Sequence, residues 1–210
     1  MPTEESRIRN IEKVLDSALY CFKKYGIEGT KMSMVSKHSG VSVRSITRYF
    51  STKENLVLKC MEKHLDYIKQ AIEKQLVINN ANDKSGLEQL QIFLESWRMT
   101  FIRDPQFYIF LTDVDMFFYK NKMNSELVSR YISNEFANKN IVKLYINNGI
   151  KDGSINPNTD VNAITDFIFS ALSGFMRRVV LMKYLSPTVG DDYIEQQLST
   201  YIRKIVEYLK

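Results

Sequence analysis

Apolar residues recur at three- and four-residue steps along most of the chain, which is the spacing that places side chains on one face of an α-helix. The first such stretch covers residues 8–22 and ends before Gly26. Two short apolar sets follow, within residues 32–39 and 43–50, and Gly40 separates them. The N-terminal quarter is therefore predicted to form one longer helix and two short ones.

Residues that commonly begin helices stand before these stretches. Thr30 is a plausible N-cap for the second helix, and Ser42 is one for the third. Ser51 and Glu54 have the spacing of a capping box, which predicts that a long fourth helix starts at about residue 52.

The rest of the chain repeats the helical pattern between turn-rich segments. The composition of Asn79–Gly86 indicates a loop, and so does that of Asn147–Asp160. No strand-like alternation of useful length occurs, so we predict an all-α fold of about nine helices. The five later helices are expected at Leu87–Phe101, Phe107–Phe118, Leu127–Ile146, Val161 to about Tyr184, and Asp191 to the C-terminus.

The positive charge is confined to the first third of the chain. Residues 1–64 contain 12 Lys and Arg against 7 Asp and Glu, whereas residues 65–210 contain 17 of each. No acidic residue lies between Glu28 and Glu54. A purely basic segment beside a neutral remainder indicates a polyanionic partner, although a solvated basic face has the same composition.

Residues 30–50 meet the requirements of a helix-turn-helix. Gly40 suits the left-handed conformation of a tight turn, and apolar Val41 can fill the angle between the two helices. In this motif the second helix enters the DNA major groove, and the first crosses the backbone. Arg44 is suited to guanine, Val43 to a thymine methyl, and basic or hydroxyl side chains to phosphates. The expected DNA-binding residues are Thr30, Lys31, Ser33, Ser42, Val43, Arg44, Ser45, Thr47, Arg48, Tyr49 and Lys53.

Two sequence segments carry a family resemblance, namely LYCFKKYGIEGT at the end of the first helix and GVSVRSITRYFSTKENL after it. Residues 8–58 resemble the DNA-binding domain of the tetracycline-repressor (TetR) family. Thr47 departs from the family's usual tyrosine, and Ser36 departs from a common alanine. The matching positions are Gly40, Val41, Ser42, Tyr49, Phe50, Lys53, Glu54 and Leu56.

The resemblance implies a transcription regulator, most simply a repressor, with two domains. Residues 1–54 are expected to form a three-helix DNA-binding domain, and residues 55–210 a helical effector-binding and dimerisation domain. The expected partners are double-stranded operator DNA, a second copy of the chain and a small hydrophobic or amphipathic effector. A two-fold dimer reads a near-palindrome.

Aromatic residues gather in one part of the second domain. Residues 93–119 contain nine of the 25 aromatic residues of the chain, where even spreading would place about three. Ligand pockets are rich in such rings, but so are plain cores, and both interpretations remain open. The candidate pocket residues are Phe93, Trp97, Phe101, Phe110, Asp113 and Phe117.

The last two helices are candidates for a four-helix dimer interface, an interpretation that the family's common use of these helices favours. Small residues on the first of them permit close helix approach, although packing within one chain is the alternative. The candidate interface residues are Phe167, Ala171, Gly174, Phe175, Leu198, Ile202 and Ile205.

Other classes of function find little support in the sequence. No nucleophile motif or phosphate-binding glycine loop appears, and the two histidines lack ligand partners at metal-binding spacing, so we expect neither an enzyme nor a metal or cofactor. Cys21 and Cys60 are expected to be buried thiols. A polar N-terminus and the lack of a long apolar run predict a cytoplasmic protein without membrane contact. The alternatives are a C-terminal domain that binds a protein, and a helical scaffold that does not bind DNA.

Overall fold

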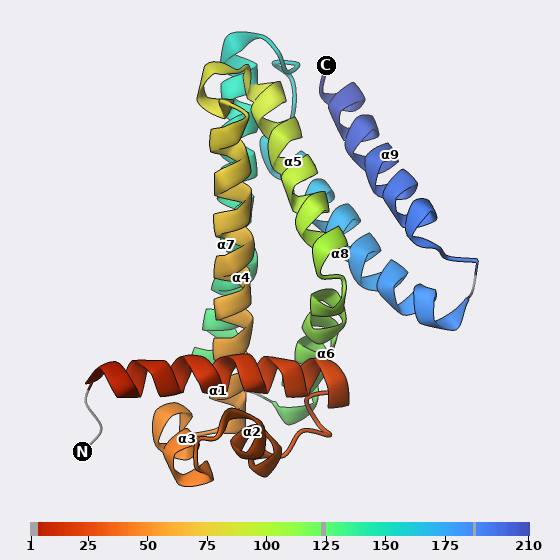
Figure 1. Ribbon diagram of the computed structural model, residues 1–210. Coiled ribbons are helices and arrows are strands. Elements are labelled where there is room, and N and C mark those ends of the chain that lie inside the picture. Colours follow the sequence, from red (N-terminus) through yellow and green to blue (C-terminus); the bar gives the residue numbers. More distant parts are fainter. Residues whose placement is uncertain (1–3, 123–124, 187) are drawn as a thin grey trace. The chain divides into compact units, whose positions relative to one another are not determined.

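The computed structural model describes residues 4–122, 125–186 and 188–210, and these residues form nine α-helices and one short 3₁₀ helix (Figure 1). The all-α prediction is confirmed. The elements are α1 (Glu4–Tyr25), α2 (Met32–Ser39), α3 (Val43–Phe50), α4 (Lys53–Ile78), η1 (Ala81–Asp83), α5 (Gly86–Arg103), α6 (Gln106–Asn121), α7 (Ser125–Asp152), α8 (Val161–Leu185) and α9 (Asp191–Leu209).

The chain divides into two compact units. The first contains Met1–Asp66 and Ile109–Asn134, and the second contains Tyr67–Tyr108 and Glu135–Lys210. Helices α4, α6 and α7 each begin in one unit and end in the other. The domain boundary expected at residue 54 therefore remains a prediction, because the first unit also includes parts of α6 and α7.

The core of the first unit comes from the apolar stripes that the sequence displays. Val14, Ala18 and Phe22 of α1 are buried, as are Ile46 and Phe50 of α3. Full burial of a large apolar side chain stabilises the folded state by roughly 1.5–3 kcal/mol. Since α2 and α3 have only eight residues each, this packing rather than helix propensity keeps them folded.

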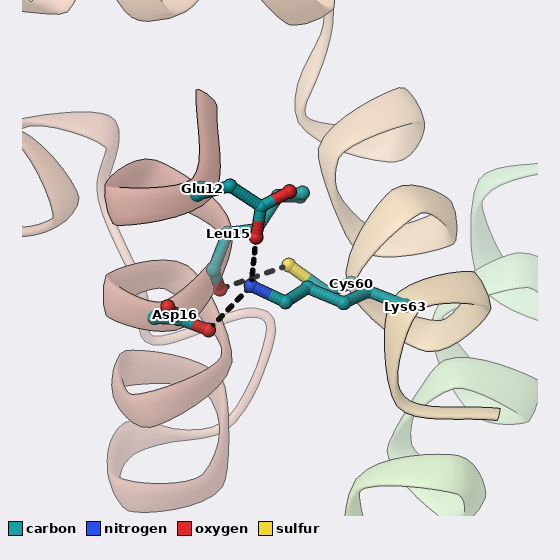
Figure 2. A network of polar contacts seen from close by, with 5 residues as sticks. All are labelled: Glu12, Leu15, Asp16, Cys60 and Lys63. Atoms are coloured by element: carbon teal, nitrogen blue, oxygen red, sulfur yellow. Dashed lines mark hydrogen bonds and ion pairs between the residues drawn. The ribbon is translucent and has the colours of Figure 1, made fainter. Parts of the chain in front are cut away.

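Polar contacts between α1 and α4 reinforce this core (Figure 2). Lys63 Nζ lies 2.5 Å from Glu12 Oε2 and 2.7 Å from Asp16 Oδ1, so one lysine joins two carboxylates on successive turns of α1. Burial lowers the pKa of Lys63, but the hydrogen bonds to Asp16 and Glu12 outweigh it and raise that pKa. One turn earlier, the buried Cys60 thiol donates to the Leu15 carbonyl, and burial raises its pKa. Both cysteines are free and buried, as expected.

Helix α5 begins against the end of α7 in the second unit. Asp152 Oδ2 accepts a hydrogen bond from the Gly86 N–H at 2.7 Å, and Ser154 Oγ accepts one from the Leu87 N–H at 3.2 Å. The two backbones come so close that a Cβ on Gly86 would lie 2.0 Å from the Gly149 nitrogen. The loop expected from Asn147 is therefore wrong for residues 147–152, which belong to α7. Gly149 serves close packing against Gly86 and does not form a turn.

Helix α9 covers α5 in the second unit. Its buried residues are Ile194, Leu198, Ile202, Ile205, Val206 and Leu209. In the same unit, Trp97 Nε1 of α5 donates to the Tyr108 hydroxyl at 2.9 Å in a buried contact, and Trp97 packs against Phe169 of α8. Among the residues described, no helix combines the length and the apolar character that a membrane span requires.

An ion pair in the first unit generates a prediction about pH. Glu62 lies 2.8 Å from Lys59 and 2.7 Å from Arg130. Burial tends to raise the pKa of the Glu62 carboxyl, but these two hydrogen bonds outweigh it and lower that pKa below 4.5. A depressed pKa stabilises the folded state above the unfolded pKa, and the contribution is lost as the pH falls through the folded pKa.

Glu62→Gln is therefore expected to lower the free energy of unfolding by about 1 kcal/mol at pH 7, after allowance for partial solvent screening. In urea unfolding, the difference in free energy of unfolding between the wild type and Glu62→Gln should be constant down to about pH 5 and become smaller below it. Glu28→Gln, which removes an exposed carboxylate from the same unit, is the control and should show little change. A gap of the same size at pH 4 and pH 7 would contradict this assignment.

Candidate nucleic-acid interface

Helices α2 and α3 are joined by a turn centred on Gly40. Its φ of 71° lies in the left-handed region, and its N–H donates to the Ser36 carbonyl at 3.0 Å, which closes α2. Val41 is buried beside it, and the Val41 N–H donates to Ser39 Oγ at 3.2 Å. The expected roles of Gly40 and Val41 are confirmed.

The start of α3 is capped as the sequence predicts. Ser42 has extended backbone angles, and its hydroxyl oxygen accepts a hydrogen bond from the Ser45 N–H at 3.2 Å. The cap expected for α4 is wrong in detail: Thr52 Oγ1, not Ser51, accepts from the Asn55 N–H at 3.2 Å. Ser51 instead closes α3 with a φ of 63°.

Thr30 has a different role from the one expected. Its side chain is buried, and its hydroxyl donates to the carbonyls of Cys21 at 3.1 Å and Gly26 at 2.7 Å. The N-cap of α2 is Lys31. The N-cap expectation for Thr30 is therefore wrong, and its hydroxyl holds the turn after α1 instead. The DNA contact expected of this buried residue stays a prediction.

One side of α3 faces solvent and carries the remaining candidates. Ile46 and Phe50 are buried on the opposite side, and Val43 keeps 40% of its surface exposed despite being apolar. Exposed apolar surface on a short helix suits contact with a partner such as a thymine methyl. Ser42, Arg44, Thr47 and Arg48 are exposed as well, whereas Ser45 and Tyr49 are partly covered.

The basic side chains surround this side. Lys31 and Ser33 are exposed at the start of α2, and the Arg48 guanidinium lies 5.3 Å from the centre of the Tyr49 ring. Lys53 is half-buried at the first position of α4, as expected, with Nζ 5.8 Å from the centre of the Phe117 ring. The helix dipole and the free N–H groups of a helix start favour an anion at such a position.

His38 takes no part in a metal or catalytic arrangement that the structure displays. Its ring stacks on Tyr20 with centroids 4.5 Å apart, and its Nδ1 lies 3.0 Å from Ser17 Oγ. These contacts attach α2 to α1, and they account for a histidine whose role the sequence left open.

The six residues expected to form one effector pocket belong to two different compact units. Phe93, Trp97 and Phe101 are buried in the second unit, where Phe101 packs against Tyr108 with centroids 4.9 Å apart. Phe110, Asp113 and Phe117 belong to the first unit, and Phe110 stacks on Phe22 of α1. The common pocket expected for these six residues therefore stays a prediction.

The residues expected at a dimer interface also separate into two groups. Leu198, Ile202 and Ile205 are buried within the single chain, with at most 3% of their surface exposed, and Ile205 also lines the groove described below, so their interface role stays a prediction. Helical periodicity alone does not distinguish the two apolar faces of a long helix. On α8, by contrast, Phe167 and Gly174 are exposed, and Ala171 and Phe175 are partly so.

A groove of about 670 Å³ lies beside this open face of α8. Ala163, Ile164 and Phe167 line one wall, and Tyr201 and Tyr208 of α9 line the other. Phe167 exposes 56% of its surface, and Tyr208 exposes 75%. Tyr208 is not among the residues expected from the sequence, although its position on α9, away from the Ile and Leu stripe, is a usable signal.

Comparisons with known proteins agree with this geometry. Residues 14–60 match the family model of bacterial regulatory proteins, tetR family. A search of curated proteins finds no sequence match. The fold resembles that of the fatty acid degradation regulator FadR from Bacillus halodurans, with a TM-score of 0.74 and 16% identity over 95% of this chain and 99% of that one.

Two further solved structures share the fold. FadR from Bacillus subtilis, solved in complex with stearoyl-CoA, gives a TM-score of 0.69 with 18% identity over 95% of this chain and 99% of that one. PfmR from Thermus thermophilus gives 0.67 with 18% identity over 94% and 98%. At such identities the likeness establishes the fold alone, whereas the family match establishes the DNA-binding segment.

The cap on α3 generates a stability prediction. Ser42→Ala removes the acceptor for the Ser45 N–H and should lower the free energy of unfolding by about 1 kcal/mol, whereas Ser42→Gly should cost roughly a few tenths, since glycine leaves the amide open to water. Urea denaturation followed by circular dichroism measures both. Equal losses for the two variants would show that the hydroxyl does not cap the helix.

Proposed function

We propose that the chain is a DNA-binding transcription regulator of the tetR family, whose model matches residues 14–60, and that it represses transcription from a near-palindromic operator. It binds there as a homodimer, and a small hydrophobic or amphipathic effector releases it. We also assign it to the cytoplasm, where its DNA lies.

The exposed side of α3 supports this proposal most strongly. Val43, Arg44 and Thr47 stand on a helix whose other side is buried, and the 25 positions from Gly29 to Lys53 contain no acid. In the major groove Arg44 donates two hydrogen bonds to a guanine, Ser45 and Thr47 pair with other base edges, and Val43 meets a thymine methyl. Ser42, Arg48, Tyr49, Lys53, Lys31 and Ser33 bind phosphates and fix the register.

The groove beside α8 supports the homodimer. A large apolar surface on a soluble chain marks an interaction site, and small residues at 163, 171 and 174 let a second helix approach closely. Two copies related by a two-fold axis place their α3 helices about 34 Å apart, which is one turn of DNA.

The effector site is proposed in the second unit. A cavity of about 230 Å³ there is lined by Phe101, Ile102 and Val180, with Lys183 and Asp191 paired at 2.6 Å at its edge. Ligand pockets are commonly about 300–1,000 Å³, so an effector must widen this cavity. An effector that binds one conformer of the chain more tightly than another changes the affinity for DNA through linkage. Such a coupling is typically about 1–3 kcal/mol. FadR from Bacillus subtilis, a neighbour in fold, was solved with an amphipathic thioester, stearoyl-CoA.

Two substitutions test the DNA-binding face on a duplex selected from a random pool by the wild-type chain. Arg44→Ala should weaken binding to the selected duplex by about ten- to a hundredfold and relax preference at one base pair. Lys53→Ala should weaken binding to all duplexes alike and reduce the slope of log Kd against log salt by about one. Fluorescence anisotropy over a range of salt concentrations measures both effects.

Lys74→Ala is the matched control, because Lys74 is an exposed lysine on the same helix as Lys53 but lies outside the DNA-binding unit. It should leave the affinity and the slope unchanged. If Arg44→Ala loses affinity equally on every sequence, Arg44 does not read bases.

A third substitution tests the dimer. Phe167→Asp places a charge in the centre of the open α8 face and should weaken self-association at least tenfold, as measured by analytical ultracentrifugation. Val77→Asp, which changes a residue that is 76% exposed on α4, is the control and should sediment as the wild type does. A Phe167→Asp protein that remains dimeric would place the interface elsewhere.

A further inference from the structure

A single carboxylate on α6 contacts the turn that leads into the DNA-binding helices. Asp113 Oδ2 accepts a hydrogen bond from the backbone N–H of Ile27 at 2.5 Å, across 86 positions of sequence. Both residues belong to the first compact unit. We propose that Asp113 is a positioning residue for DNA binding, which holds the entry to α2 in the orientation that α3 needs. The proposal rests on the proposed function and makes no use of contact between Asp113 and DNA.

Other hydrogen bonds of the turn between α1 and α2 lie within the turn and the end of α1, among them one from the Thr30 N–H to the Ile27 carbonyl at 3.2 Å. Gly26 closes α1 with a φ of 73°, and the Thr30 hydroxyl joins the two ends of the turn from within. The Ile27 side chain is fully buried, but a buried side chain does not fix the direction of its own N–H. The hydrogen bond to Asp113 does so, because it ties that amide to an atom on a different helix.

The Asp113 carboxylate also lies close to the backbone of Gly26. A Cβ on Gly26 would lie 3.5 Å from Asp113 Oδ2, so the carboxylate approaches the turn at ordinary contact distance. A backbone N–H bonded to a carboxylate is stronger than one bonded to a neutral acceptor. Asp113 is also partly buried, so water competes less for the Ile27 amide.

Two neighbours of Asp113 on the same face of α6 contact adjoining parts of the same unit. Phe110, three positions earlier, stacks on Phe22 in the last turns of α1, with centroids 6.0 Å apart and planes 8° apart. Phe117, four positions later, lies under the Lys53 ammonium at the start of α4. Spacings of three and four residues place all three on one face of a helix. This face of α6 therefore contacts the end of α1, the turn and the start of α4.

The test uses the full-length chain with three substitutions. Asp113→Ala removes the acceptor, and Asp113→Asn removes the charge but keeps a carbonyl oxygen that can accept from Ile27. Asp115→Ala is the matched control, because Asp115 is an acid on the same helix whose carboxylate accepts from the Tyr131 hydroxyl instead of the turn. The readouts are the Kd for the duplex selected by the wild type and the hydrogen-exchange rate of the Ile27 amide. Both are taken at a temperature where circular dichroism shows every variant folded.

We expect Asp113→Ala to bind the selected duplex about tenfold more weakly and to exchange the Ile27 amide at least tenfold faster. Asp113→Asn should stay within about threefold of the wild type in both readouts, and so should Asp115→Ala. The sign is informative, because removal of a negative charge near DNA would by itself strengthen binding. A pure charge effect would therefore make both Asp113 variants bind the selected duplex more tightly than the wild type.

Several results would overturn the proposal. The first is wild-type affinity in Asp113→Ala, and the second is an equal loss in Asp113→Asn. The third concerns the wild type alone: hydrogen exchange of the Ile27 amide that is as fast as that of Glu28. If the wild type binds no duplex, both the proposed function and this role are refuted. If the wild type and Asp113→Ala bind the duplex equally well, only the role of Asp113 is refuted.

Discussion

The DNA-binding surface depends on the burial of two side chains, Ile46 and Phe50, in the core of the first unit. An eight-residue helix does not form stably by itself in water, so α3 exists only because this apolar side is held. The same packing decides which side of α3 remains free for DNA. The other features of the unit preserve this arrangement: the Gly40 turn sets the angle between α2 and α3, the Ser42 cap satisfies an amide of α3, and Lys63 fastens α1 to α4.

The DNA-binding unit could be predicted from the sequence because its signals are local. A glycine at a left-handed turn, a serine before a helix and a run without acids each identify a feature within a few residues. Thr30 misled because a hydroxyl before a helix suits an N-cap and an internal hydrogen bond equally well. Nothing local indicates that Asp113 reaches the Ile27 amide 86 positions away.

The second unit was harder to predict for a related reason. Long helices with apolar residues on more than one side do not reveal which side is internal, so the sequence does not show that Leu198, Ile202 and Ile205 are already buried within the single chain. The helical stretch Asn147–Asp152 appeared turn-like because its glycine serves close packing with Gly86. Neighbours in fold at 16–18% identity reproduce the architecture with different side chains, so the effector has to be found by experiment.

Guanine methylation interference on the duplex selected by the wild-type chain tests the central claim most directly, since it reports on the N7 atoms that line the major groove. A dimer that inserts one α3 helix into each half-site should give two patches of interference about 10 base pairs apart, related by two-fold symmetry. Binding without interference at any major-groove guanine, or interference confined to a single patch, would contradict the account.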